Sequence, residues 1–173
     1  DGVPVVMCHG FPELGYSWRH QLPAVAGAGF RAIAPDQRGY GNTGGPKGPD
    51  AVPLYDIAHL TDDLAGMLDA LGIDKAVFVG HDWGGMVAWQ MPLRHPDRVA
   101  GVIGVNTPFI PRGPVDPIAA MRMVYGEDMY IVYFQQFGVA EKIFDADVAR
   151  SMRFWYRKSA MKLCPPTRKT FHS

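Results

Sequence analysis

The segment Gly-His-Asp-Trp-Gly-Gly at positions 80–85 constrains the fold more than any other feature of the sequence. It directly follows the apolar run Ala76–Val79 and directly precedes a stretch with helical character. A strand, a tight turn flanked by small residues and a helix, in this order, display the residue at the tip of the turn. That residue is Asp82. The segment therefore predicts an α/β fold with a carboxylate displayed at the end of a buried strand.

Asp82 is a candidate nucleophile. Turns of this kind commonly carry a serine at the tip. A carboxylate that attacks carbon forms an alkyl ester on the protein, and this chemistry suits epoxides and alkyl halides better than peptides or esters. The structural alternative is an aspartate that caps the helix that follows it. The glycines on both sides of the turn favour the nucleophile.

The alternation of strands and helices predicts a parallel sheet that helices cover on both faces. Short apolar runs predict strands, and apolar residues at helical spacing predict helices. The predicted strands span 3–8, 30–34, 76–79 and 99–105, and the predicted helices span 17–28, 55–71 and 86–94. Ligands of such sheets bind beyond the carboxyl ends of the strands. The polar residues at these ends are His9, Asp36, Asp82 and Asn106.

The pattern changes after Asn106. A proline-rich exit leads to a stretch over 116–162 that is predicted to be helical and is dense in methionine and aromatic residues. We interpret residues 1–106 as a partial α/β core and residues 107–173 as the beginning of a helical lid. The chain enters its first strand almost at once and closes no element at its end, so we expect a piece truncated at both ends.

Composition narrows the choice of function. Lysine and arginine (17) balance aspartate and glutamate (17), so no basic surface predicts binding to nucleic acid. No run of roughly 18 apolar residues predicts a membrane span. No histidine or cysteine spacing resembles a metal site. The distant pair Cys8 and Cys164 does not predict a disulfide framework, so a cytoplasmic location is favoured. The sequence does not decide whether the protein forms a homodimer.

Five motifs occur in order along the chain. They are His-Gly-Phe-Pro at 9–12, Gly-Tyr-Gly at 39–41, Gly-His-Asp-Trp-Gly-Gly at 80–85, Asn-Thr-Pro-Phe-Ile-Pro at 106–111 and Tyr-Phe-Gln at 133–135. Together they resemble the soluble type of epoxide hydrolase with the α/β-hydrolase fold. The resemblance covers nearly the whole chain, to about residue 157. It implies hydrolysis of a small apolar epoxide to a vicinal diol through an aspartyl ester, without a cofactor or a metal.

The resemblance also implies roles for single residues. Asp82 matches the nucleophile, and the backbone N–H groups of Phe11 and Trp83 match the oxyanion hole. Tyr130 matches a lid tyrosine that protonates the epoxide oxygen. The family's second lid tyrosine, its orienting acid and its water-activating histidine have no match in the 173 residues. The residues that the resemblance places around the substrate are His9, Pro12, His81, Trp83, Phe109 and Tyr133.

Several of these residues also have structural interpretations. His9 and His81 occupy positions that shape turns, and Tyr130 lies among aromatic residues with which it could pack. A cis peptide bond is expected before Pro12. Solvated surface positions are predicted for His95, Asp62 and Asp63.

Two alternative functions remain open at this point. A dehalogenase also uses an aspartate at this turn. Haloalkane dehalogenases, however, carry Asn or Glu where this chain has Phe11, and fluoroacetate dehalogenases carry Arg where it has Trp83. The other alternative is a truncated chain without turnover, because the downstream acid and histidine are missing.

Overall fold

The computed structural model describes residues 2–156, so Cys164 and the end of the predicted helical stretch lie outside it. The chain divides into two units, residues 1–110 and the residues from Pro111 onward, and each is described by itself. The sequence predicts the boundary after Asn106, and the division follows Ile110. None of the helices in the described range is long and apolar enough to cross a membrane.

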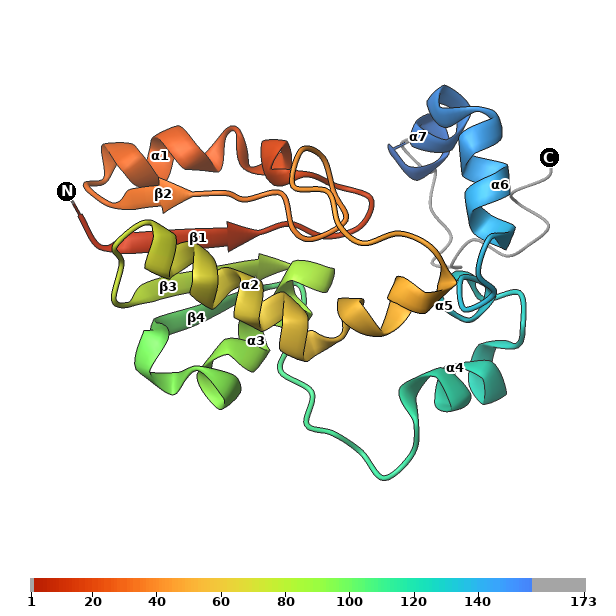
Figure 1. Cartoon of the computed structure of the whole chain (residues 1–173). Coiled ribbons are helices and arrows are strands. Elements are labelled where there is room, and N and C mark those ends of the chain that lie inside the picture. The colour runs from red at the N-terminus through yellow and green to blue at the C-terminus, as the bar shows by residue number, and fades with distance from the viewer. Residues whose placement is uncertain (1, 157–173) are drawn as a thin grey trace. The chain divides into compact units, whose positions relative to one another are not determined.

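Four parallel strands form the sheet of the first unit, in the order β2-β1-β3-β4 (Figure 1). Their bounds are Pro4–Cys8 for β1, Arg31–Ile33 for β2, Ala76–His81 for β3 and Val99–Val105 for β4. From β1 the chain continues to β2, which pairs on one side of β1, and then crosses back to β3, which pairs on the other side of β1. The strand order therefore reverses between β1 and β3, and such a switch point is where parallel sheets bind ligands.

Helices cover both faces of this sheet because β1 and β3 are buried on both sides. On one face, Val5 and Met7 of β1 pack with Trp18 of the short helix η1 (Gly15–Trp18) and with Leu22 and Val25 of α1 (Gln21–Gly27). On the other face lie α2 (Ile57–Ala70) and α3 (Trp83–Arg94). The buried cluster of that face includes Val6, Cys8, Leu64, Leu68, Phe78, Val87 and Met91. Alternate residues of one strand thus belong to two different cores.

The helices differ from the prediction at three places. The helix expected over 17–28 is split into η1 and α1, because Pro23 has no N–H and fits only in the first turn of a helix. The helix after the turn begins at Trp83 rather than at Met86, because the glycines at 84 and 85 allow it to start beside the sheet. The loop after β2 contains the short helix η2 (Pro49–Tyr55). A further short helix, η3 (Pro96–Arg98), precedes β4.

The second unit is helical, as the sequence predicts. Its helices are α4 (Pro117–Tyr125), α5 (Tyr130–Tyr133), α6 (Val139–Ala146) and α7 (Val148–Tyr156). Gly126 and Gly138, with φ of 81° and 79°, interrupt the helical stretch. An aromatic cluster around the buried Tyr133 joins α5, α6 and α7.

Replacement of Leu68 by alanine tests the core beneath α2. Leu68 is fully buried, whereas Leu93 of α3 is 62 % exposed, so the same substitution at Leu93 is a matched control. We expect Leu68→Ala to lower the free energy of unfolding by about 2–5 kcal/mol and Leu93→Ala to change it by less than about 0.5 kcal/mol. Urea denaturation measures both. Equal losses would contradict the assignment of the core.

Candidate active site

Asp82 alone forms the turn between strand and helix. Strand β3 ends at His81 and helix α3 begins at Trp83. Asp82 has φ 52° and ψ −123°, a backbone conformation that residues other than glycine rarely adopt. Such a conformation costs about 1–3 kcal/mol and persists only where the surroundings fix it. The turn therefore displays Asp82 at the carboxyl end of the sheet, as the sequence predicts.

Two glycines let the turn be this tight. A Cβ atom at Gly80 would lie 2.5 Å from the Cα of Gly85. A Cβ atom at Gly84 would lie 2.5 Å from the carbonyl oxygen of His9 and would also collide with the carbonyl of Cys8. The first turn of α3 thus packs directly on the end of β1. Any side chain at these positions would push the helix away from the strand.

The carboxylate of Asp82 contacts the loop after β1. The backbone N–H of Phe11 donates a hydrogen bond to Asp82 Oδ1 at 2.9 Å. A Cβ atom at Gly10 would lie 2.7 Å from the same oxygen, so the loop backbone passes close to the carboxylate. The Phe11–Pro12 peptide bond is cis, as expected. The Asp82 side chain makes no capping hydrogen bond to α3, so the helix-cap interpretation is wrong.

Trp83 places a second N–H group beside Asp82. It is the first residue of α3, and the N–H groups at the start of a helix have no acceptor within the helix. The helix dipole adds partial positive charge at this end. Both effects favour negative charge at the turn. The Trp83 side chain itself is 47 % exposed.

His9 is a structural residue. It is fully buried, and both of its ring nitrogens are occupied. Nδ1 lies 2.8 Å from the carbonyl oxygen of Gly10, and Nε2 accepts a hydrogen bond of 3.0 Å from the backbone N–H of Gln37. Tyr40 packs its ring edge-on against the imidazole, with centroids 4.8 Å apart. The geometry agrees with the turn-shaping interpretation of His9.

His81 pairs with a residue that sequence reasoning missed. Its Nδ1 lies 3.1 Å from Oε2 of Glu13. The same carboxylate oxygen accepts a hydrogen bond of 3.3 Å from the N–H of Gly10. Glu13 therefore links the loop after β1 to the residue before Asp82. Glu13 directly follows the His-Gly-Phe-Pro motif, and this position is the feature of the sequence that could have marked it as a site residue.

Tyr40 is a second residue that the sequence did not assign to the site. Burial and, to a smaller extent, the negative charge of Asp82 raise the pKa of the Tyr40 phenol to about 12. The phenol therefore stays neutral at physiological pH. Burial likewise raises the pKa of the Cys8 thiol to about 12, so Cys8 is not a nucleophile near neutral pH.

The other predicted site residues lie farther along the chain. Phe109 is 45 % exposed and packs at an angle on Trp89 of α3, with ring centroids 6.1 Å apart. Tyr130 and Tyr133 belong to the second unit. The Tyr130 ring meets Trp155 edge-on at 5.6 Å, and Tyr133 is 4 % exposed within the same aromatic cluster.

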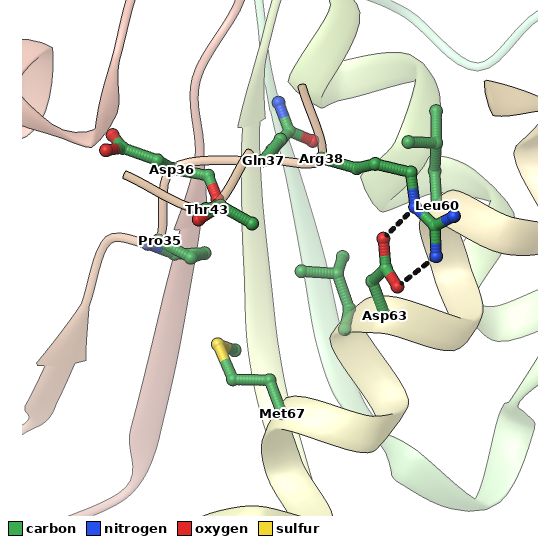
Figure 2. Close-up of a pocket in the computed structure, with 9 residues that line it drawn as sticks. Pro35, Asp36, Gln37, Arg38, Thr43, Leu60, Asp63 and Met67 are labelled. Atoms are coloured by element: carbon green, nitrogen blue, oxygen red, sulfur yellow. Dashed lines mark hydrogen bonds and ion pairs between the residues drawn. The ribbon is translucent and has the colours of Figure 1, made fainter. Parts of the chain in front are cut away.

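A separate pocket of about 160 Å³ lies between the loop after β2 and helix α2 (Figure 2). At its rim the Arg38 guanidinium makes two hydrogen bonds to the Asp63 carboxylate, at 2.5 Å and 2.6 Å. This pair raises the pKa of Arg38. Asp36, which also lines this pocket, accepts a hydrogen bond of 2.8 Å from the N–H of Gly15 and so ties the loop after β2 to η1.

The side chains of Asp62 and Asp63 on the outer face of α2 are exposed, as predicted, but each also has an ionic partner that the sequence did not indicate. Asp63 pairs with Arg38, and Asp62 Oδ1 lies 2.9 Å from His95 Nε2. The partners lie more than 20 positions apart, so a reading of one helix face could not find them. These pairs remain largely solvated, and each is worth about 0–1 kcal/mol. Among residues 2–156, no group of three or more histidine, cysteine or acidic side chains could hold a metal ion.

Alanine at position 84 tests the contact between α3 and β1. We expect Gly84→Ala to destabilise the first unit, because the new Cβ meets backbone atoms that cannot rotate away. Gly66→Ala in α2 is the matched control, since nothing lies within 4 Å of a Cβ atom there. Alanine is favoured over glycine in a helix by up to about 1 kcal/mol, so the control should gain stability. Urea denaturation measures the free energy of unfolding of both variants. An increase for Gly84→Ala as well as for Gly66→Ala would contradict the close packing of α3 on β1.

Comparisons with known proteins agree with this geometry. The family model described as alpha/beta hydrolase fold matches residues 3–163. Epoxide hydrolase A of Mycobacterium tuberculosis is 53 % identical over 154 residues, which are 88 % of this chain and 47 % of that protein. Bifunctional epoxide hydrolase 2 of Rattus norvegicus is 42 % identical over 160 residues, which are 92 % of this chain and 28 % of that protein.

A solved structure gives the same result. The crystal structure of epoxide hydrolase A from Mycobacterium thermoresistibile superposes with a TM-score of 0.82 at 52 % identity, over 90 % of this chain and 48 % of that one. The chain spans about half the length, or less, of the relatives it matches. The resemblance drawn from the five motifs is confirmed, and the chain belongs to the α/β-hydrolase fold family.

Proposed function

We propose that this chain carries the nucleophilic half of an epoxide hydrolase site, with Asp82 as the nucleophile. One observation supports this above all others. The Asp82 carboxylate does not cap its helix but accepts the Phe11 N–H from the neighbouring loop at 2.9 Å. The relatives compared above are named epoxide hydrolases, which supports the choice of substrate class.

The hydrogen bond from Phe11 gives the two carboxylate oxygens of Asp82 different roles. Oδ1 is held by the loop, so Oδ2 is the oxygen that attacks a ring carbon of the epoxide. The new bond joins Oδ2 to that carbon, and the bond from the same carbon to the epoxide oxygen breaks. The released oxygen takes a proton from a general acid, since an alkoxide without a proton leaves poorly. We assign that role to Tyr130 by its match to the family motif.

Release of the product needs a second step. Water adds to the ester carbonyl of Asp82, and we assign the stabilisation of the oxyanion to the N–H groups of Phe11 and Trp83. The bond from the carbonyl carbon to Oδ2 then breaks. The departing alkoxide takes the proton that the water gives up, and the diol leaves. Neither His9, whose nitrogens are occupied, nor His81, which pairs with Glu13, is assigned as the base for this water. We therefore propose alkylation of Asp82 as the step that these residues support.

Dehalogenation is less well supported. Phe11 and Trp83 occupy the positions at which the two dehalogenase types carry their halide-binding or carboxylate-binding residues, and the relatives compared above are epoxide hydrolases. A small apolar epoxide is the proposed substrate. The lid role of the second unit, a homodimer and a cytoplasmic location stay predictions.

Replacement of Asp82 by asparagine tests the proposal. The amide keeps the size of the side chain and an acceptor for Phe11, but it removes the charged nucleophile. We expect the 173-residue chain incubated with styrene oxide to gain the mass of one epoxide on the peptide that contains Asp82, or to form diol. Asp82→Asn should do neither. Asp97→Asn, at an exposed position in η3, is the matched control and should react as the parent chain does.

Intact-mass spectrometry and peptide mapping give the readout. An adduct on Asp82→Asn, or diol formed by that variant at the parent rate, would contradict the proposal. An adduct that stays at one equivalent without diol would mean that the second step needs a base outside this site.

A further inference from the structure

Asp82 and Asn106 leave the sheet side by side, and both have a positive φ. Strands β3 and β4 pair in register up to His81 and Val105, so Asp82 and Asn106 are the next residues on each strand. Their φ angles are 52° and 59°. Within residues 2–156 they are the two residues other than glycine with positive φ. Asp82 keeps its rare conformation only where its surroundings fix it, and the adjacent end of β4 is in position to do so.

Asn106 and Thr107 contact both peptide groups that flank the Asp82 Cα atom. Asn106 Oδ1 lies 3.4 Å from the backbone N of Asp82 and accepts its N–H. The Thr107 hydroxyl lies 3.2 Å from the carbonyl oxygen of Asp82 and 3.1 Å from Asn106 Oδ1. Two consecutive residues therefore reach the N–H on one side of the nucleophile and the C=O on the other.

Trp89 fixes this pair from helix α3. Its indole N–H donates a hydrogen bond of 2.8 Å to the carbonyl oxygen of Thr107. The three elements meet closely because two glycines leave room. A Cβ atom at Gly85 would lie 2.6 Å from Thr107 Cβ, and one at Gly104 would lie 2.7 Å from Trp89 Nε1. The end of β4 is thus held against the turn by its own side chains and by α3.

We propose that Asn106 and Thr107, together called the latch, are positioning residues that hold the Asp82 backbone so that Oδ2 of its carboxylate faces the substrate. This proposal rests on the proposed function of Asp82. The Phe11 N–H fixes one carboxylate oxygen, but the direction of the other depends on the backbone angles of Asp82. The carbonyl of Asp82 also accepts the N–H groups of Gly85 and Met86 from α3, whereas Asn106 restrains the N–H side. A misplacement of about 1 Å can cost about 100-fold in rate.

Substitutions at Thr107 separate the hydroxyl from the shape of the side chain. Thr107→Val removes the hydroxyl and keeps the volume, and Thr107→Ser keeps the hydroxyl. Under single-turnover conditions with styrene oxide, we expect Thr107→Val to lower the saturating rate of Asp82 alkylation about tenfold, which is the typical value of one lost hydrogen bond. The epoxide concentration at half-saturation should change less than about twofold, because the latch does not contact substrate. Thr107→Ser should alkylate Asp82 at close to the parent rate.

Substitutions at Asn106 separate the amide from the backbone conformation. Asn106→Gly tolerates the positive φ but lacks the acceptor for the Asp82 N–H. We expect it to lower the saturating rate about as much as Thr107→Val does. Parent-like alkylation by both Asn106→Gly and Thr107→Val would overturn the proposal, as would a slow Thr107→Ser. Circular dichroism and thermal melting confirm that each variant is folded.

Amide hydrogen exchange of Asp82 keeps the two proposals distinguishable. Loss of the acceptor should raise the exchange rate of the Asp82 N–H in Asn106→Gly relative to the parent chain. If the parent chain forms neither adduct nor diol, the nucleophile proposal fails, and the exchange data still decide whether the latch exists. Unchanged exchange of this amide in Asn106→Gly would overturn the latch.

Discussion

The hydrogen bond from the Phe11 N–H to Asp82 Oδ1 is the interaction on which the site depends. It joins residues 71 positions apart, and the strand order brings them together. Because β1 and β3 are neighbours at the point where the order reverses, the loop after one strand faces the turn after the other. Without this contact the Asp82 carboxylate would be an ordinary solvated side chain at the start of a helix.

The turn can be strained because its surroundings leave it little freedom. Gly80 and Gly84 let α3 begin directly on the end of β1, so Asp82 must make the whole change of direction. The loop after β1 restrains its carboxylate, and the residues after β4 approach its two peptide groups. A cost of about 1–3 kcal/mol is small beside the burial of the strands that carry these loops. Packing in the sheet thus maintains a geometry that the turn would not adopt alone.

The sequence was sufficient for features that depend on local pattern. The glycines around Asp82 predicted the turn, the apolar runs predicted the four strands, and the alternation of strands with helices predicted their parallel arrangement. It could not give contacts that depend on register. Glu13 reaches His81, and Thr107 reaches Asp82, because particular strands pair residue for residue. The same limit explains the ion pair of Asp63, whose partner lies on a loop 25 positions away.

The backbone amide of Phe11 offers the most direct test of this account. In NMR spectra recorded at one pH, the ¹H shift of the Phe11 amide should lie farther downfield in the parent chain than in Asp82→Asn, because a hydrogen bond to a charged acceptor is shorter and stronger than one to a neutral amide. The Asp97→Asn control should leave this shift unchanged. A Phe11 amide shift that is the same in the parent chain and in Asp82→Asn would contradict the central claim that this N–H holds the nucleophile.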